Sequence, residues 1–283
     1  MPDFALPTLM VEPIVRAALL EDLGRAGDIT TDAIVPADLV AEAVIAARQP
    51  GTVAGCQVAE LAFKLIDPAM AVTVEAPDGT RVGPGDVVLR LKGAARALLT
   101  AERTALNLQC HLSGIATATA ELVEAVRGTK AAVTCTRKTT PGLRALEKAA
   151  VRAGGGANHR FGLDDAILIK DNHIALAGSV TGAIEAARQR IGHLVKIEVE
   201  VDTLDQLEEA MTAAPDVVLL DNMDPATLAR AVAFVDGRAI LEASGRITRD
   251  TARAIAESGV DLISAGWLTH SSKALDLGLD IAI

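Results

Sequence analysis

The spacing of apolar residues changes about midway along the 283-residue chain. In the first part, residues 11–24 (VEPIVRAALLEDLG) have the spacing of a helix that ends at a glycine, and residues 60–67 (ELAFKLID) have that of a second helix. The segment GDITTDAIVP is expected to be a loop. Short strands are expected in AEAVIAARQPG, in GTVAG and around the turns of AVTVEAPDGTRVGPGDVVLRLKG. This part is therefore expected to mix helices and strands.

A long helical stretch follows at about residues 94–126, with an expected break near Ser113 and Gly114. From about residue 131, short apolar segments alternate with amphipathic helices to give six βα units. Runs of β-branched residues and leucine between short loops favour parallel strands that are buried on both faces. Such a series forms an open doubly wound sheet or a (β/α) barrel, and because six units are fewer than eight, the barrel would be small or incomplete.

We place the domain boundary within the long helix. The N-terminal domain is expected at residues 1–115 and the second domain at residues 116–270. Residues 271–283 follow the sixth βα unit and are expected to return to pack on the first domain. No low-complexity tract or long linker interrupts this organisation.

Each predicted parallel strand ends in charged or small polar residues. In a (β/α) barrel, the side chains that carry out chemistry lie at these carboxyl ends. The first two strands supply cations, the next two supply carboxylates and the last two supply small residues. These suit, in turn, an anionic substrate, ribose hydroxyls or Mg²⁺, and a phosphate group. In strand order, the residues are Thr136, Arg137 and Lys138; Lys170; Glu200; Asp221; Ser244 and Gly245; and Gly266.

Composition narrows the function classes. The net charge is −10, and there are no tyrosines, one tryptophan and four phenylalanines, which argues against a nucleic-acid binder. No apolar run approaches the ~18 residues of a membrane span, and the first residues do not have the pattern of a signal peptide. The three cysteines form no CxxC pair, so we expect reduced thiols in a cytoplasmic protein.

Although the chain is acidic overall, the segment from Arg137 to Lys170 contains seven basic residues and only three acidic ones. Some of the basic residues lie at helical spacing after Pro141 and are expected on an exposed helix face. The glycine run at 154–156 ends a helix, and we expect it also to let the backbone approach a ligand next to Asn158.

Long motifs in the chain resemble those of the quinolinate phosphoribosyltransferases, which are type II phosphoribosyltransferases. In the second part these are TRKTTPGLR, AGGG followed by HR, GL, DA and LIKDNH, then EVEVDTLDQ, LLDN, EASG and S-x-G-x-LTH. In the first part, EDLG…GDITTDAIVP and AERTALNL…LSGIATAT are also similar to the family. The resemblance therefore covers nearly the whole chain, in the right order.

The resemblance implies an α/β protein, with an N-terminal open-faced α/β sandwich domain and an incomplete (β/α) barrel. It also implies transfer of the phosphoribosyl group of phosphoribosyl pyrophosphate to quinolinate with decarboxylation. The products are nicotinate mononucleotide, pyrophosphate and CO₂, in NAD biosynthesis. Mg²⁺ is the implied cofactor. The implied assembly is a homodimer with shared active sites, or a higher oligomer.

The resemblance further implies how quinolinate, a planar dianion, is bound. Arg137 and Arg160 would clamp its carboxylates, together with Arg103 of the partner subunit, because guanidinium groups bind carboxylates in a bidentate way. Positive charge around the ring or the phosphates would come from three further residues of the same motifs. These are Lys138, His159 and Lys170, with Thr136 beside them.

For the sugar, the resemblance implies that Glu200 and Asp221 bind the ribose hydroxyls, directly or through Mg²⁺, and offset the positive charge of an oxocarbenium-like transition state. With Lys138, they are the expected catalytic residues. The 5′-phosphate would be held by the loops after the fifth and sixth strands. Those residues are Ser244, Gly245, Arg246, Ala265 and Gly266.

Several points stay open at this stage. Glu198 would lie on the opposite face from Glu200 if the strand is regular, or would point inward and help to bind Mg²⁺. Arg246 stands where the family often has a second glycine. Trp267 stands where a small residue or methionine is common, so that it either crowds the phosphate or faces the helices.

Two other functions fit parts of the pattern. One is a Schiff-base aldolase or decarboxylase with Lys170 as the nucleophile, which the neighbouring cation Arg137 disfavours. The other is a non-catalytic phosphate-binding relative, which the presence of both Glu200 and Asp221 disfavours.

Overall fold

The computed structural model describes residues 5–282, which form two compact units. The first unit comprises the chain up to Ala120, residues Thr139–Gly155 and the chain from Leu268 onward. The second unit comprises Glu121–Lys138 and Gly156–Trp267. Among the described residues, no helix is both long enough and apolar enough to cross a membrane.

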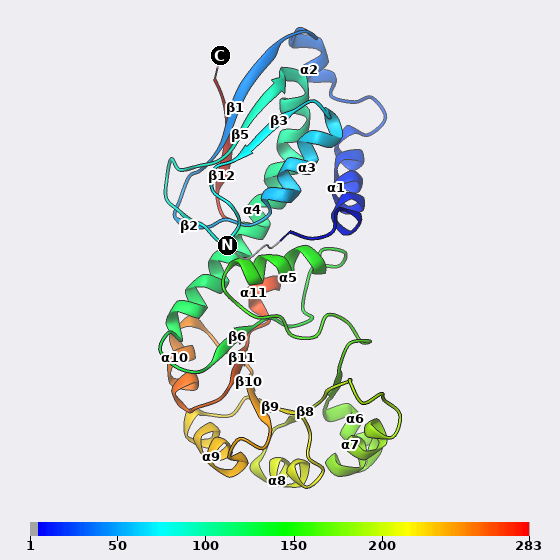
Figure 1. Cartoon of the computed structure of the whole chain (residues 1–283), viewed down its shortest axis with the longest axis vertical. Helices are drawn as coiled ribbons and strands as arrows, with labels where there is room; N and C mark the ends of the chain where they lie inside the picture. Colours follow the sequence, from blue (N-terminus) through cyan, green and yellow to red (C-terminus); the bar gives the residue numbers. More distant parts are fainter. Residues whose placement is uncertain (1–4, 283) are drawn as a thin grey trace. The chain divides into compact units, whose positions relative to one another are not determined.

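The first unit is built on a four-stranded antiparallel sheet. Its order is β12 (Leu277–Ala282), β1 (Val40–Ala47), β5 (Val87–Ala94) and β3 (Ala71–Val74). A two-stranded sheet joins β2 (Gly51–Thr52) to β4 (Arg81–Val82). Helices α1 (Thr8–Leu23), α3 (Cys56–Ile66) and α4 (Ala95–Ala125) lie along one side of the large sheet (Figure 1). The unit also contains α5 (Arg144–Ala153).

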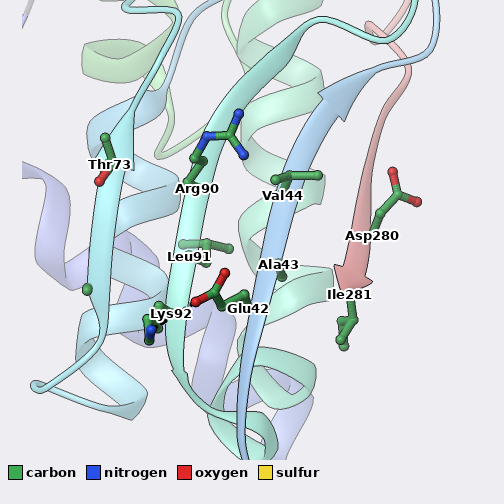
Figure 2. A pocket seen from close by; sticks show the side chains of 10 residues that line it. Glu42, Ala43, Val44, Thr73, Arg90, Leu91, Lys92, Asp280 and Ile281 are labelled. Carbon is green, nitrogen blue, oxygen red and sulfur yellow. Dashed lines mark ion pairs between the residues drawn. The ribbon is translucent and has the colours of Figure 1, made fainter. Parts of the chain in front are cut away.

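The large sheet carries charged side chains on its outward positions. They line a shallow groove of about 400 Å³, in which Glu42 and Lys92 form an ion pair of 2.8 Å (Figure 2). Both partners of this pair are exposed, and such pairs contribute little to stability. None of the residues expected in the functional site lines this groove.

Two expectations about the first unit are wrong. The segment expected to be a loop contains a short helix, α2 (Ile29–Ile34), because the side chain of Asp28 caps it by accepting a 2.9 Å hydrogen bond from the backbone N–H of Thr31. Helix α4 continues without a break for 31 residues. Gly114 serves close packing instead: an added Cβ would lie 2.2 Å from the carbonyl oxygen of Lys273.

The second unit is a six-stranded parallel sheet. In spatial order, the strands are β6 (Ala132–Thr134), β11 (Leu262–Ser264), β10 (Ile240–Ser244), β9 (Val217–Asp221), β8 (Ile197–Val201) and β7 (Ile167–Ile169). The first strand in sequence thus lies beside the last. In a doubly wound sheet the first strand lies in the interior, so the strand order identifies a barrel. Within residues 5–282, the other edge of β6 forms a single bridge, from Thr134 to Ala157, so the barrel is incomplete, as expected.

The helices that follow the strands of the barrel are short. They are α6 (Asp171–Ala177), α7 (Val180–Arg188), α8 (Leu204–Thr212), α9 (Pro225–Val235), α10 (Arg249–Glu257) and α11 (Trp267–His270). Four of them begin at a side chain that accepts a hydrogen bond from a backbone N–H three residues further on. The capping residues are Ser179, Thr203, Asp224 and Thr248. The last three of these caps fix where the loops after β8, β9 and β10 end, and Ser179 fixes the start of α7 after α6.

Candidate active site

Strand register places the candidate carboxylates on one face of the barrel sheet. Leu219 of β9 is paired with Glu200 of β8 on one side and with Glu242 of β10 on the other. Asp221, two residues after Leu219, is paired with Ser244. Residues in register across parallel strands share a face, as do residues two apart in one strand. Glu200 and Asp221 therefore lie on the same face, toward the carboxyl ends of neighbouring strands.

Lys170 follows β7 and forms an ion pair with Glu200 of the neighbouring strand. The lysine side chain is 47% exposed, and the glutamate side chain is 15% exposed. The lysine nitrogen is thus engaged by a neighbouring carboxylate rather than free to attack a carbonyl group, which argues against the Schiff-base alternative.

The guanidinium groups of Arg137 and Arg160 interact electrostatically. Burial lowers the pKa of Arg160, and the charge of Arg137 lowers it further, while Glu198 and Asp165 oppose these effects. The Nη1 atom of Arg160 donates a 3.0 Å hydrogen bond to the carbonyl oxygen of Ala166, and its buried Nε has no hydrogen-bond partner. Two like charges beside an unsatisfied donor are the expected arrangement of a site that binds an anion.

The turn after Arg160 is held by Asp165. Its carboxylate accepts hydrogen bonds from the backbone N–H groups of Phe161, at 2.6 Å, and Gly162, at 2.9 Å. Burial alone would raise the pKa of Asp165, but these two bonds, together with its own backbone N–H and the charge of Arg160, lower the pKa. The turn fixes the backbone on the carboxyl side of Arg160.

His159 is held by the protein through both ring nitrogens. Nδ1 accepts a 2.8 Å hydrogen bond from the backbone N–H of Arg160. Nε2 lies 2.9 Å from Glu198 and 3.8 Å from Glu242, both of which are buried. Burial and the charge of Glu198 raise the pKa of Glu242 to about 7, although His159 acts against this shift. The three side chains form a polar network that links His159 to the backbone of Arg160.

The expectation that Glu198 lies on the opposite face from Glu200 is wrong. Residues two apart in a strand share a face, and both residues belong to the unbroken strand β8. The metal-binding atoms of His159, Glu198 and Glu242 lie within 4.8 Å of one another. An imidazole beside two carboxylates suits a transition metal rather than Mg²⁺, so this cluster does not support the Mg²⁺ role considered for Glu198.

The expected phosphate-binding residues follow β10 and β11. Gly245 and Arg246 both have positive φ, 98° and 50°, so the chain turns sharply after Ser244. The indole N–H of Trp267 donates a 2.8 Å hydrogen bond to the carbonyl oxygen of Ile247. The indole ring of Trp267 is therefore accommodated by a hydrogen bond to the loop after β10.

The remaining expected residues lie on three separate segments. Thr136 and Lys138 follow β6, where the threonine hydroxyl accepts a 3.0 Å hydrogen bond from the backbone N–H of Lys138. Ala265 and Gly266 follow β11. Arg103 lies on α4, in the first unit. The structure thus brings Lys170 together with Glu200, and Arg137 together with Arg160, from separate segments of the chain.

Sequence reasoning missed one residue and one contact of this region. Glu242 lies two residues before Ser244 in LEAS, so strict alternation along the strand would have placed it on the inner face. Asn222, which follows Asp221, donates a 2.5 Å hydrogen bond from Nδ2 to Oδ2 of Asp221. No spacing rule would have found this contact, because it depends on the backbone conformation of one residue.

Comparison with known proteins gives a consistent result. The family model for the C-terminal domain of quinolinate phosphoribosyl transferase matches residues 115–280, and that for the N-terminal domain matches residues 28–113. The chain is 48% identical over 272 residues to the nicotinate-nucleotide pyrophosphorylase (carboxylating) of Mycobacterium leprae, covering 94% of this chain and 95% of that protein. A probable nicotinate-nucleotide pyrophosphorylase (carboxylating) of Bacillus subtilis is 44% identical, with coverage of 97% and 94%.

Solved structures agree with this result over the full length. The crystal structure of NadC from Streptococcus pyogenes has a TM-score of 0.94 and 42% identity, and the match covers 99% of each chain. The nicotinate-nucleotide pyrophosphorylase from Francisella tularensis has a TM-score of 0.94 and 39% identity, and the match covers 100% of each chain.

Proposed function

The chain belongs to the quinolinate phosphoribosyltransferase family, and on that premise we propose that it converts quinolinate and phosphoribosyl pyrophosphate into nicotinate mononucleotide, pyrophosphate and CO₂. It is then a pentosyltransferase of NAD biosynthesis. The observation that carries the proposal is the buried Nε of Arg160, which has no hydrogen-bond partner and lies within the electrostatic influence of a second cation, Arg137.

Quinolinate has two carboxylates that can bind the guanidinium groups of Arg137 and Arg160. It is a flat pyridine ring with two adjacent carboxylates, and the planar guanidinium groups bind carboxylates through paired hydrogen bonds. Arg160 donates two hydrogen bonds within the protein. Its Nη1 donates to the carbonyl oxygen of Ala166, and its backbone N–H donates to Nδ1 of His159. Such support orients the guanidinium group before the substrate arrives, which lowers the entropic cost of binding.

Glycosyl transfer then requires stabilisation of a developing positive charge. The pyridine nitrogen attacks the anomeric carbon, the bond to pyrophosphate breaks, and the sugar passes through an oxocarbenium-like state. Glu200 and Asp221 share one face of the sheet and bind the ribose hydroxyls. There, their negative charge offsets the positive charge that develops on the sugar. Ser244, Gly245 and Gly266 hold the 5′-phosphate, with Thr136 and Lys138 facing the ring.

Decarboxylation follows from the charge on the alkylated ring. The carbon–carbon bond to the 2-carboxylate breaks, and its electron pair stays at C2 beside the cationic nitrogen, where a proton replaces CO₂. The protein contributes by holding the ring and excluding water from it. Lys138, at the end of β6, is the cationic side chain that we assign to this part of the site.

We assign Mg²⁺ to Glu200 and Asp221. Carboxylate oxygens are hard ligands of the kind that Mg²⁺ prefers, and one or two protein carboxylates combined with substrate phosphates are its usual environment. When bound, Mg²⁺ would neutralise charge on the leaving pyrophosphate.

We further propose that the enzyme acts as a homodimer, with Arg103 of the partner subunit completing each site. This rests on the family resemblance of the AERTALNL motif and on the position of Arg103 on a helix outside the barrel unit. We also propose a cytoplasmic location, which the three free cysteines support.

The test is the release of ¹⁴CO₂ from quinolinate labelled in its 2-carboxylate. We expect release only when phosphoribosyl pyrophosphate is present, in step with pyrophosphate formation. Release without the sugar substrate, or trapping of a stable adduct by borohydride, would instead point to the Schiff-base chemistry of Lys170.

A further inference from the structure

The carboxylate of Asp221 and the loop after β10 are joined by a single residue, Asn222. Three contacts define the joint. The side-chain Nδ2 of Asn222 donates to Oδ2 of Asp221 at 2.5 Å. Its backbone N–H donates to the carbonyl oxygen of Ser244 at 2.9 Å. An added Cβ on Gly245 would lie 2.3 Å from Oδ1 of Asn222 and 2.8 Å from its backbone nitrogen.

The backbone of Asn222 is in the left-handed region, with φ of 53°. Asparagine tolerates this conformation better than most other side chains do. The conformation turns the chain directly after the last residue of β9, so that the amide reaches back to Asp221 while the backbone reaches across to β10. The amide group of Asn222 must present its nitrogen to Asp221, because the amide oxygen would be repelled by the carboxylate.

Gly245 completes the arrangement. Its φ of 98° suits glycine, and the lack of a Cβ leaves room for the amide group of Asn222. The side chain of Asn222 therefore touches a carboxylate assigned to the ribose hydroxyls and a loop assigned to the 5′-phosphate.

We propose that Asn222 is a positioning residue that fixes the separation between Asp221 and the loop Ser244–Gly245. The inference rests on the proposed function. The ribose hydroxyls and the 5′-phosphate belong to one rigid sugar phosphate, so a site that binds both gains affinity only if the two groups that hold them keep the matching distance. Asn222 does not touch the substrate in this role, and it acts on the phosphoribosyl pyrophosphate half of the site alone.

Two variants separate the side chain from the backbone. Asn222→Gly keeps the left-handed conformation without strain and removes the amide. Asn222→Asp keeps the size of the side chain, but it cannot donate to Asp221 and adds a second carboxylate beside it. We expect each variant to raise the KM for phosphoribosyl pyrophosphate at least about tenfold, which corresponds to one hydrogen bond to a charged group.

Quinolinate serves as the internal control. Its Kd, measured by calorimetry without the sugar substrate, should stay within about twofold of the wild-type value, because the guanidinium clamp lies on other segments. If the role of Asn222 were purely structural, its replacement would weaken the binding of quinolinate and of phosphoribosyl pyrophosphate together. An unchanged KM for phosphoribosyl pyrophosphate in either variant, or an equal loss for quinolinate, would overturn the inference. A wild-type enzyme that binds no phosphoribosyl pyrophosphate would overturn the proposed function, and the inference with it.

Discussion

Lys170 and Glu200 form an ion pair across two neighbouring strands of the barrel, at the end where the candidate catalytic residues lie. The pair orients the carboxylate of Glu200, which in the proposed function binds the ribose hydroxyls. Because the lysine is half exposed, the pair itself adds at most about 1 kcal/mol to stability.

Replacement of Glu200 by Gln should therefore lower kcat with little effect on folding. Loss of one preorganised charge at the oxocarbenium centre costs about 3 kcal/mol in barrier height, or about a hundredfold in rate. Steady-state kinetics and thermal unfolding of the same sample give both quantities. A kcat within threefold of the wild-type value would remove Glu200 from the catalytic residues.

Arg160→Ala should abolish detectable quinolinate binding. The variant removes a guanidinium group that repels Arg137 in the free protein, so folding should not be impaired. Isothermal calorimetry measures the binding, and Arg190→Ala, which removes an exposed arginine on the same unit, is the matched control. Affinity that survives in Arg160→Ala would contradict the clamp.

Shared active sites predict complementation between two inactive variants. Arg103→Ala and Arg137→Ala should each be inactive alone. After mixing and reassociation, half of the dimers are mixed, and one of the two sites in each mixed dimer has both arginines. About a quarter of the wild-type activity should return. If Arg103 acts within its own subunit, every site in the mixture lacks one arginine and no activity returns.

Glu242 should make stability depend on pH. Burial raises its pKa in the folded protein to about 7, against 4.5 for an ordinary glutamate. The folded state therefore holds a proton that the unfolded state has released, and stability falls as pH rises from about 4.5 to about 7, by about 3 kcal/mol in total. Chemical unfolding across this range should show the fall in the wild-type protein but not in Glu242→Gln. Parallel pH profiles for the two proteins would show that Glu242 titrates normally.

The series of parallel strands and the identity of the strand-end residues were predictable because both follow from short-range patterns, whereas the choice of a barrel over a doubly wound sheet came from the family resemblance. A buried parallel strand reads as an apolar run, and its carboxyl end is where the run stops. Lys170, Glu200 and Asp221 were all found in this way. The pairing of Lys170 with Glu200 was not predicted, because it depends on which strands are neighbours and on their register.

The errors have a common physical cause. The expected break at Gly114 came from reading glycine as a helix breaker, whereas its role is to admit the backbone of Lys273, which is 159 positions later in the sequence. Likewise, the network of His159, Glu198 and Glu242 joins three segments that are distant in sequence and that only the folded sheet brings together. Contacts of long sequence separation leave no local signal.

The edge strand β12 pairs with β1 along six residues of each, although it consists of residues near the very end of the chain. During synthesis, β1 leaves the ribosome long before its partner exists. The nascent protein must therefore carry an uncovered sheet edge until β12 has been synthesised, and that edge is where a chaperone or an unwanted strand from another molecule would bind first.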